Sequence, residues 1–159
     1  MQEVLTIEKK NAIVAHTEAN EKGKKMLENL FGRKVFLGNV MDRVKTFEDA
    51  CAELGIDFGD ACPHLQKNGD YPAIVAFSKA LIITRALNEG WTPDFDNGQW
   101  DKYYPYFDMR SSAGGFRFSD YDCDYVSTHV GARLCFKSEE LAKYAGTQFE
   151  DIYKGFMTF

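Results

Sequence analysis

The sequence predicts an α+β fold with N-terminal helices, a central buried helix, a small antiparallel sheet and a C-terminal helix. In the first part of the chain apolar residues recur at helical spacing, whereas in the second part they alternate with polar residues. A last amphipathic segment follows Ser138. We expect a single domain over residues 1–159, mainly helical at 1–90, with an aromatic-rich sheet and its helix at 91–159.

Two short helices are predicted ahead of the central one. The segment 21–31 ends before Gly32 and carries four apolar residues on one side, Met26, Leu27, Leu30 and Phe31. Another helix begins after Thr46, a good capping residue, and ends at Gly55, which suits the left-handed position after a helix. Residues 56–70 are rich in Gly and Asp and predict a loop.

The longest helical pattern runs from Pro72 to Gly90, with proline in the first turn and glycine after the end. Its apolar residues cover most of the circumference: Ile74, Val75, Phe77, Leu81, Ile82, Ile83 and Leu87. A helix that is apolar nearly all round is buried, so we expect this one at the centre of the fold. Because Lys79 and Arg85 interrupt the short run, we expect no membrane span.

The alternating part of the chain predicts three short strands after an Asn-Gly turn at residues 97–98. The first strand, Tyr103–Met109, contains Pro105, which cannot donate a ladder hydrogen bond and therefore indicates an edge position. The second covers residues 116–126, where aromatic and polar residues alternate. The third is a short strand at residues 132–136.

The C-terminal segment predicts one further helix. Ser138 can cap it, and Glu139 and Glu140 in its first turn suit the positive end of the helix dipole. Its apolar stripe comprises Leu141, Ala145, Phe149, Ile152 and Phe156. Since this stripe and the central helix both need apolar partners, we expect most aromatic side chains of the strands to lie in the core.

Composition and charge restrict the partners. The net charge is −5 with a pI of about 5.2, and basic residues form no stripe. Contact along a phosphate backbone needs clustered Lys or Arg, so extended duplex nucleic acid is not an expected partner. The cysteines form no Cys-x-x-Cys pair, and the N-terminus lacks the pattern of a signal peptide. We therefore expect a cytoplasmic protein with reduced thiols.

Three aspartates alternate at Asp120, Asp122 and Asp124, so on a strand their carboxylates share one face. Such a group could hold a hard cation. The other interpretation is the solvent-facing side of an edge strand, and we favour it because no second acidic cluster supports a metal site.

Zinc and thiol chemistry have only scattered candidates. Cys62 and His64 could be completed as a zinc site by a residue from among Cys123, His129 and Cys135, but structural zinc sites normally have two close pairs of ligands. His129 and Cys135 could act as base and nucleophile only if a turn brought them together, and a packed thiol is the favoured interpretation. The chain also lacks the common catalytic motifs, so we expect no metal, no cofactor and no catalytic residue.

The candidate binding residues are aromatic and arginine side chains of the second part, where nearly half of the chain's aromatic residues lie between Trp91 and Tyr125. Arginine beside Tyr or Trp can stack on bases, clamp phosphates or bind acidic peptides. Alternatively, the arginines extend over a partly exposed aromatic sheet without a ligand. The residues that we expect to bind are Trp91, Trp100, Tyr103, Tyr104, Arg110, Arg117 and Arg133.

Three segments together carry a resemblance: KTFEDACAELGI, ALNEGWTPD with KYYPYF, and VGARLCFKSEELAKYAGTQF. With them the chain resembles, from about residue 20 onward, a family of small uncharacterised proteins of gut Bacteroidales, their phages and other mobile elements. The resemblance implies a cytoplasmic accessory protein in a bacterial or phage-infected cell, concerned with replication, packaging or host defence. It implies no catalytic residue.

We expect the protein to act by binding rather than by catalysis, as a protein-interaction module with a protein partner or a second copy of itself. One alternative is a binder of nucleotides or short single strands that uses aromatic stacking and arginines. A second alternative is a metal-dependent hydrolase.

Overall fold

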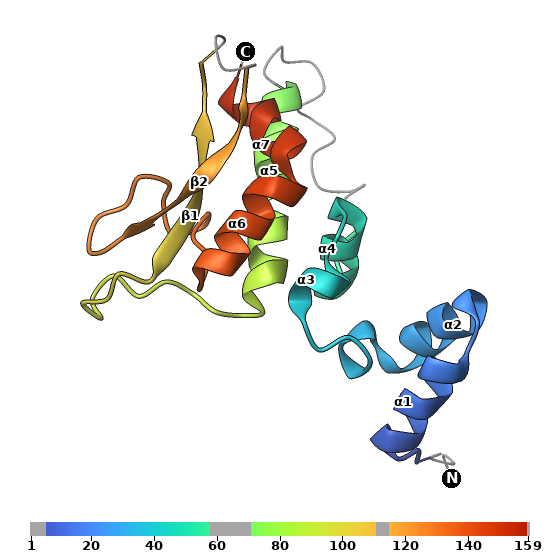
Figure 1. Cartoon of the computed structure of the whole chain (residues 1–159). Coiled ribbons are helices and arrows are strands. Elements are labelled where there is room, and N and C mark those ends of the chain that lie inside the picture. Colours follow the sequence, from blue (N-terminus) through green and yellow to red (C-terminus); the bar gives the residue numbers. More distant parts are fainter. Residues whose placement is uncertain (1–5, 58–70, 111–114, 159) are drawn as a thin grey trace. The chain divides into compact units, whose positions relative to one another are not determined.

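The computed structural model describes residues 6–57, 71–110 and 115–158, and it confirms the α+β class (Figure 1). The chain divides into two compact units, residues 1–43 and 44–159. That the whole chain forms a single domain stays a prediction. Most of the loop expected at 56–70 lies outside the described residues.

The first unit is helical. Its elements are α1 (Lys9–Glu18), α2 (Glu21–Phe31), the 3₁₀ turn η1 (Arg33–Val35) and α3 (Val40–Arg43). Asn20 caps α2 by accepting a hydrogen bond of 2.9 Å from the backbone N–H of Gly23. His16 of α1 lies 2.9 Å from Glu28 of α2 and stacks on Phe36 at 4.3 Å between ring centroids. The helix predicted at 21–31 is confirmed with the same bounds.

The second unit places helices on one face of a two-stranded sheet. Its elements are α4 (Phe47–Leu54), α5 (Tyr71–Asn88), β1 (Lys102–Asp108), β2 (Arg117–Asp124), α6 (Glu139–Gln148) and α7 (Glu150–Met157). In Figure 1 the helix α6 lies between the sheet and α5, and α4 packs against α5. As predicted, Thr46 caps α4, in a capping box with Asp49, and Gly55 follows in the left-handed conformation with φ 64°.

The C-terminal half of α5 forms the centre of this unit. Ile83 and Leu87 are fully buried, and so is Ala80. The N-terminal half is only partly covered, and Phe77 there stays 41% exposed beside Phe156 of α7, with ring centroids 5.4 Å apart. The expected central helix is therefore confirmed, but only its second half is largely buried, with Arg85 exposed there.

β1 and β2 pair antiparallel, from Lys102 opposite Asp124 to Asp108 opposite Arg117, with a bulge after Tyr106. Pro105 does lie at an edge of the sheet. The N–H of Tyr103 bonds the carbonyl of Phe136 at 3.1 Å, on the side away from β2, and the missing N–H of Pro105, two residues on, belongs to that same side.

The prediction of a third strand at residues 132–136 is wrong except at its last residue. Gly131, with φ 76°, begins a turn in which the N–H of Leu134 bonds the Gly131 carbonyl at 3.2 Å. Of the five residues only Phe136 pairs with a strand, in an isolated bridge with Tyr103. The turn leaves too few residues for a strand before the cap of α6 at Ser138.

The single C-terminal helix that we expected is two helices, α6 and α7, which meet at Phe149 with φ −119° and ψ 27°. The break is a tertiary effect, because α6 packs on the sheet whereas α7 packs on α5. At Gly146 α6 lies close to the sheet: a Cβ there would lie 2.6 Å from Cε2 of Phe118 and 2.8 Å from Cβ of Pro105.

Candidate functional site

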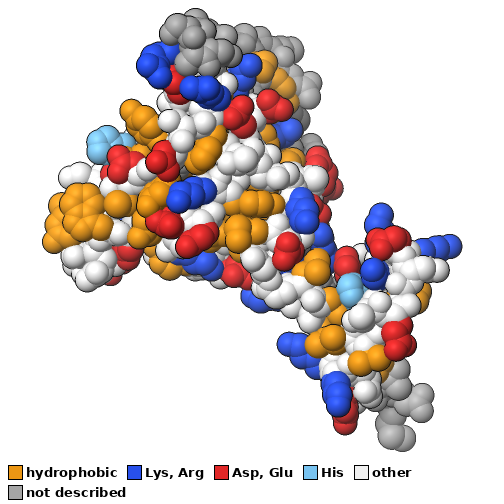
Figure 2. All heavy atoms as spheres, viewed as in Figure 1, with side chains coloured by type: hydrophobic (Ala, Val, Ile, Leu, Met, Phe, Trp, Pro, Cys, Tyr) orange, Lys and Arg blue, Asp and Glu red, His pale blue; other side chains and the backbone are white. Residues whose placement is uncertain are grey.

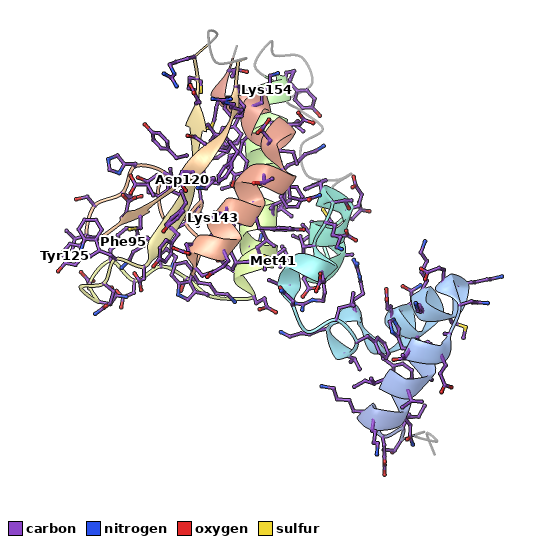
Figure 3. The ribbon with its side chains drawn as sticks, viewed as in Figure 1. Met41, Phe95, Asp120, Tyr125, Lys143 and Lys154 are labelled. Atoms are coloured by element: carbon purple, nitrogen blue, oxygen red, sulfur yellow. The ribbon has the colours of Figure 1, made fainter. Side chains whose placement is uncertain are left out.

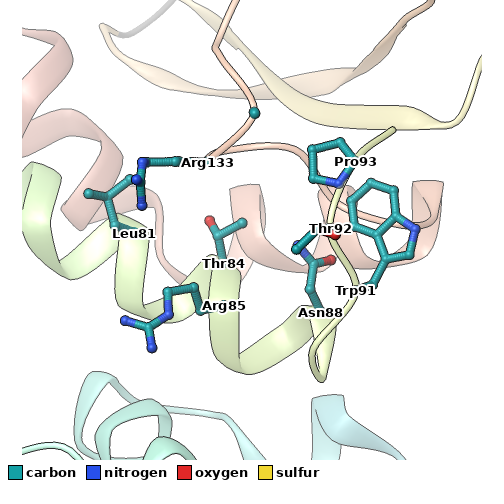
Figure 4. Close-up of a pocket in the computed structure, with 9 residues that line it drawn as sticks. Leu81, Thr84, Arg85, Asn88, Trp91, Thr92, Pro93 and Arg133 are labelled. Carbon is teal, nitrogen blue, oxygen red and sulfur yellow. The ribbon is translucent and has the colours of Figure 1, made fainter. Parts of the chain in front are cut away.

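A pocket of about 240 Å³ lies between the C-terminal half of α5 and the two segments 91–93 and 132–133. We call it the arginine pocket. Figure 4 shows Arg85 and Arg133 on one side of it and Trp91 with Pro93 on the other. Two predicted binding residues from distant parts of the sequence, Trp91 and Arg133, thus line one pocket.

The inner wall of the arginine pocket is built from two buried polar side chains of α5. The hydroxyl of Thr84 donates to the carbonyl of Ala80 at 2.9 Å. The amide of Asn88 donates to the carbonyl of Cys135 at 2.8 Å and accepts from the N–H of Lys137 at 3.1 Å. Asn88 therefore ties the segment after Arg133 to α5 beside the pocket.

The pocket has positive charge without compensation from acids. Arg85 and Arg133 are both exposed, and within the described part of the chain neither guanidinium has an ion-pair or hydrogen-bond partner. The described lining includes no Asp or Glu. Sequence reasoning missed Arg85, although a charged residue inside an otherwise apolar helix was a usable signal.

A second surface is formed by Trp100 and Tyr125, which we call the aromatic stack. Their rings lie 5.2 Å apart at an angle of 24°. Trp100 is 63% exposed, and Val126, which follows Tyr125 in the sequence, is exposed as well. Figure 2 shows hydrophobic side chains gathered at the edge of the molecule where Figure 3 labels Tyr125 and Phe95.

The loop that carries Trp100 is held by Lys102, whose side chain is fully buried. Its ammonium donates to Oδ1 of Asn97 at 2.8 Å and to the carbonyl of Gln99 at 3.1 Å, and it lies 2.5 Å from Oδ1 of Asp101. Burial alone would raise the pKa of Asp101, but hydrogen bonds from Lys102 and Asn97 hold it below its ordinary value. Sequence reasoning missed this lysine.

The other predicted aromatic residues belong to the sheet. Tyr104 is buried, and its hydroxyl lies 3.2 Å from Nδ1 of His129. Burial and the nearby Asp124 raise the pKa of Tyr104 well above its usual value. Tyr103 is half-buried and packs against Tyr121 at 5.8 Å between ring centroids. Neither lines the arginine pocket or belongs to the aromatic stack.

Arg110 and Arg117 do not line the arginine pocket; both contact the carboxylate of Asp108. Nη2 of Arg110 lies 2.8 Å from Oδ2 of Asp108, and Nη2 of Arg117 lies 3.6 Å from the same atom. Hydrogen bonds from Arg110 hold the pKa of Asp108 well below its usual range. The three predicted arginines are therefore in two places, with Arg133 alone at the pocket.

The three alternating aspartates differ in environment. Asp120 and Asp122 are exposed, whereas Asp124 is buried and bonds Nδ1 of His129 at 2.8 Å. The hydrogen bond that Nδ1–H of His129 donates to the Asp124 carboxylate raises the pKa of His129. Among residues 6–57, 71–110 and 115–158, no group of three or more possible ligands could hold a metal ion, and the zinc candidates Cys62 and His64 lie outside these ranges.

The Cys135 thiol is packed rather than reactive. It is buried and donates to the carbonyl of Gly131 at 3.3 Å. Burial raises its pKa to about 11, so the thiol stays protonated at neutral pH. The structure thus favours the packed-thiol interpretation over a nucleophile.

No protein-family model, curated protein or solved structure matches this chain. No helix in the described part is long and apolar enough to cross a membrane.

Proposed function

We propose that the protein acts as a protein-interaction module and binds its partner through the aromatic stack. The observation that carries the proposal is Trp100, which is 63% exposed on a loop that hydrogen bonds already hold in one conformation. Trp and Tyr are the residues most enriched at the energetic centres of protein interfaces.

The loop is organised before any partner arrives. Besides the bonds from Lys102, the N–H of Gln99 donates to Oδ1 of Asn97 at 2.9 Å, and the N–H of Asp96 donates to Oδ1 of Asp94 at 2.9 Å. Ordering a loop on binding costs affinity, so a loop that is ordered in advance retains more of its contact energy. The Trp100 ring is also supported from one side by Tyr125.

The charge around the stack indicates the kind of partner. Residues 94–101 contain three aspartates and no Lys or Arg, and the ammonium of the following Lys102 is buried beneath the loop. A segment with an apolar or aromatic side chain next to Lys or Arg fits this surface. Its cation could lie over the exposed indole face, an interaction that contributes about 0.5–1 kcal/mol at exposed sites.

The test compares two exposed aromatic residues of the same unit. Trp100→Ala is expected to lose the partner, whereas Tyr106→Ala, which removes a ring 58% exposed on β1, is expected to keep it. Proteins retained by the wild type and by Tyr106→Ala but not by Trp100→Ala are identified by mass spectrometry, and native mass spectrometry detects self-association. Circular dichroism verifies that both variants fold. A monomeric protein that retains the same set of proteins in all three forms would contradict the proposal.

The setting follows from the resemblance in the sequence. We propose that the interaction takes place in the cytoplasm of a bacterial or phage-infected cell, where the protein is an accessory factor of a phage or mobile element. Expression of tagged protein in a Bacteroidales host, followed by fractionation, tests the location. Recovery in the secreted fraction would contradict it.

A further inference from the structure

The arginine pocket carries two positive charges that no carboxylate of its described lining neutralises. Arg85 on α5 and Arg133 on the segment before α6 reach the same pocket, and no acid in its described lining offsets them. Elsewhere in the second unit arginines do have an acid, since Arg110 and Arg117 both contact Asp108. Two guanidinium groups that share a pocket and lack a carboxylate form a site for an anion.

The hydrogen bonds of the inner wall restrict the ligand further. The Thr84 hydroxyl and one N–H of the Asn88 amide donate to carbonyls within the fold, and the Asn88 oxygen accepts from Lys137. The two guanidinium groups are thus the charged donors that a ligand meets, and the second N–H of the Asn88 amide is a neutral donor on the same wall. The pocket therefore favours a strong, anionic acceptor.

The rest of the pocket is apolar. Leu81, Pro93 and Ala132 line it together with the half-buried indole of Trp91. Trp91 is held in place by its own backbone N–H, which bonds the carbonyl of Asn88 at 3.0 Å. A flat or apolar body can pack between these side chains while its charged end meets the arginines.

The size of the pocket sets the size of the ligand. Its volume of about 240 Å³ lies below the range of roughly 300–1,000 Å³ that is common for sites of drug-sized ligands. One ring with one anionic group fits this space, whereas an oligonucleotide does not. We infer that the arginine pocket binds a small ligand in which a phosphate or carboxylate is attached to a single aromatic or apolar body.

This binding is independent of the proposed protein interaction, so the two are tested separately. The experiments use Trp100→Phe, which leaves Trp91 as the only tryptophan and hence the only indole reporter in the chain. Phenyl phosphate, benzoate, inorganic phosphate and adenosine monophosphate are titrated by isothermal calorimetry and by Trp91 fluorescence.

We expect phenyl phosphate or benzoate to bind and to change the Trp91 emission, and inorganic phosphate to bind at least about tenfold more weakly. Arg85→Gln and Arg133→Gln are each expected to weaken binding by about tenfold or more, because each removes a charge-assisted hydrogen bond. Arg110→Gln is the matched control, since it removes an exposed arginine that contacts Asp108 outside the pocket. The affinity of this control variant for phenyl phosphate or benzoate should equal that of Trp100→Phe.

Three results would overturn the inference. One is the absence of binding by all four probes at millimolar concentration. Another is an equal loss of affinity in Arg110→Gln and Arg133→Gln, which would indicate attraction by net charge alone. The third is equal affinity for inorganic phosphate and phenyl phosphate, unchanged in Trp91→Leu, which would leave no role for the apolar wall.

Discussion

Replacing Lys102 by Met should both destabilise the protein and release the loop that carries Trp100. Met has a similar length and can fill the buried space, so the change mainly removes the ammonium. It removes the ammonium from three oxygens, those of Asn97, Gln99 and Asp101, of which Oδ1 of Asn97 keeps another donor, the N–H of Gln99. Removing one partner of a buried ion pair costs about 3–5 kcal/mol. Since the Asp101 side chain as a whole is 33% exposed, although its Oδ1 atom is buried, we expect the lower end, about 3 kcal/mol.

The measurement is urea unfolding, followed by far-UV circular dichroism and by tryptophan fluorescence. The matched control is Lys137→Met, because Lys137 pairs with Glu89 at 3.2 Å in an exposed ion pair. That change should alter the free energy of unfolding by no more than about 0.5 kcal/mol. A loss below 1 kcal/mol in Lys102→Met, with unaltered partner binding, would refute the assignment of Lys102 as the residue that organises the loop.

The same variant has a distinctive pH dependence. The folded pKa of Asp101 is lowered, so the stability that Asp101 contributes is present above its unfolded pKa of about 3.9 and is lost as the pH falls through the folded value. Without Lys102 this pKa should rise again. The difference in unfolding free energy between wild type and Lys102→Met should therefore shrink when the pH is lowered from 6 to about 3.

Three further changes test the fold and its electrostatics. Gly146→Ala should lower stability by about 1–2 kcal/mol in urea unfolding, because crowding against the sheet outweighs the better helix propensity of alanine; exposed Thr147→Ala should not lower it, and equal stability of both variants would contradict the close contact. Thr46→Ala should lower the free energy of unfolding by about 1 kcal/mol by removing the cap of α4, whereas Thr46→Ser should preserve it. In wild type the raised pKa of His129 means that its contribution to stability is present below about pH 6.5 and is lost as the pH rises through the folded pKa. Asp124→Asn should return that pKa to about 6.5 in an NMR titration, and an unshifted titration curve would argue against the Asp124–His129 bond.

Local sequence patterns predicted a structural feature correctly where the residues that determine it are close in sequence. The capping box at Thr46, the left-handed Gly55 and the edge position of Pro105 all appear as expected. The first two depend on a hydrogen bond or backbone preference within a few residues, and the third follows because proline has no N–H to donate to a neighbouring strand.

The mistaken elements are those in which distant contacts decide the outcome. The helix break at Phe149 has no local signal, and it occurs because α6 and α7 pack on different partners. The prediction of a third strand was wrong because the turn that begins at Gly131 brings only Phe136 beside Tyr103. Periodicity records which residues are apolar but not which surface they will meet.

For the candidate sites, the sequence by itself determined which residue types were available: an aromatic-rich second part with few arginines and no catalytic motif. Only the tertiary structure decided how they are grouped. It separated Arg133 from Arg110 and Arg117, joined it to the overlooked Arg85 beside Trp91, and placed Trp100 on a loop fixed by a buried lysine. The physical reason is that a pocket depends on charge and burial contributed by several elements, and burial of a side chain such as Lys102 exists only after those elements have packed.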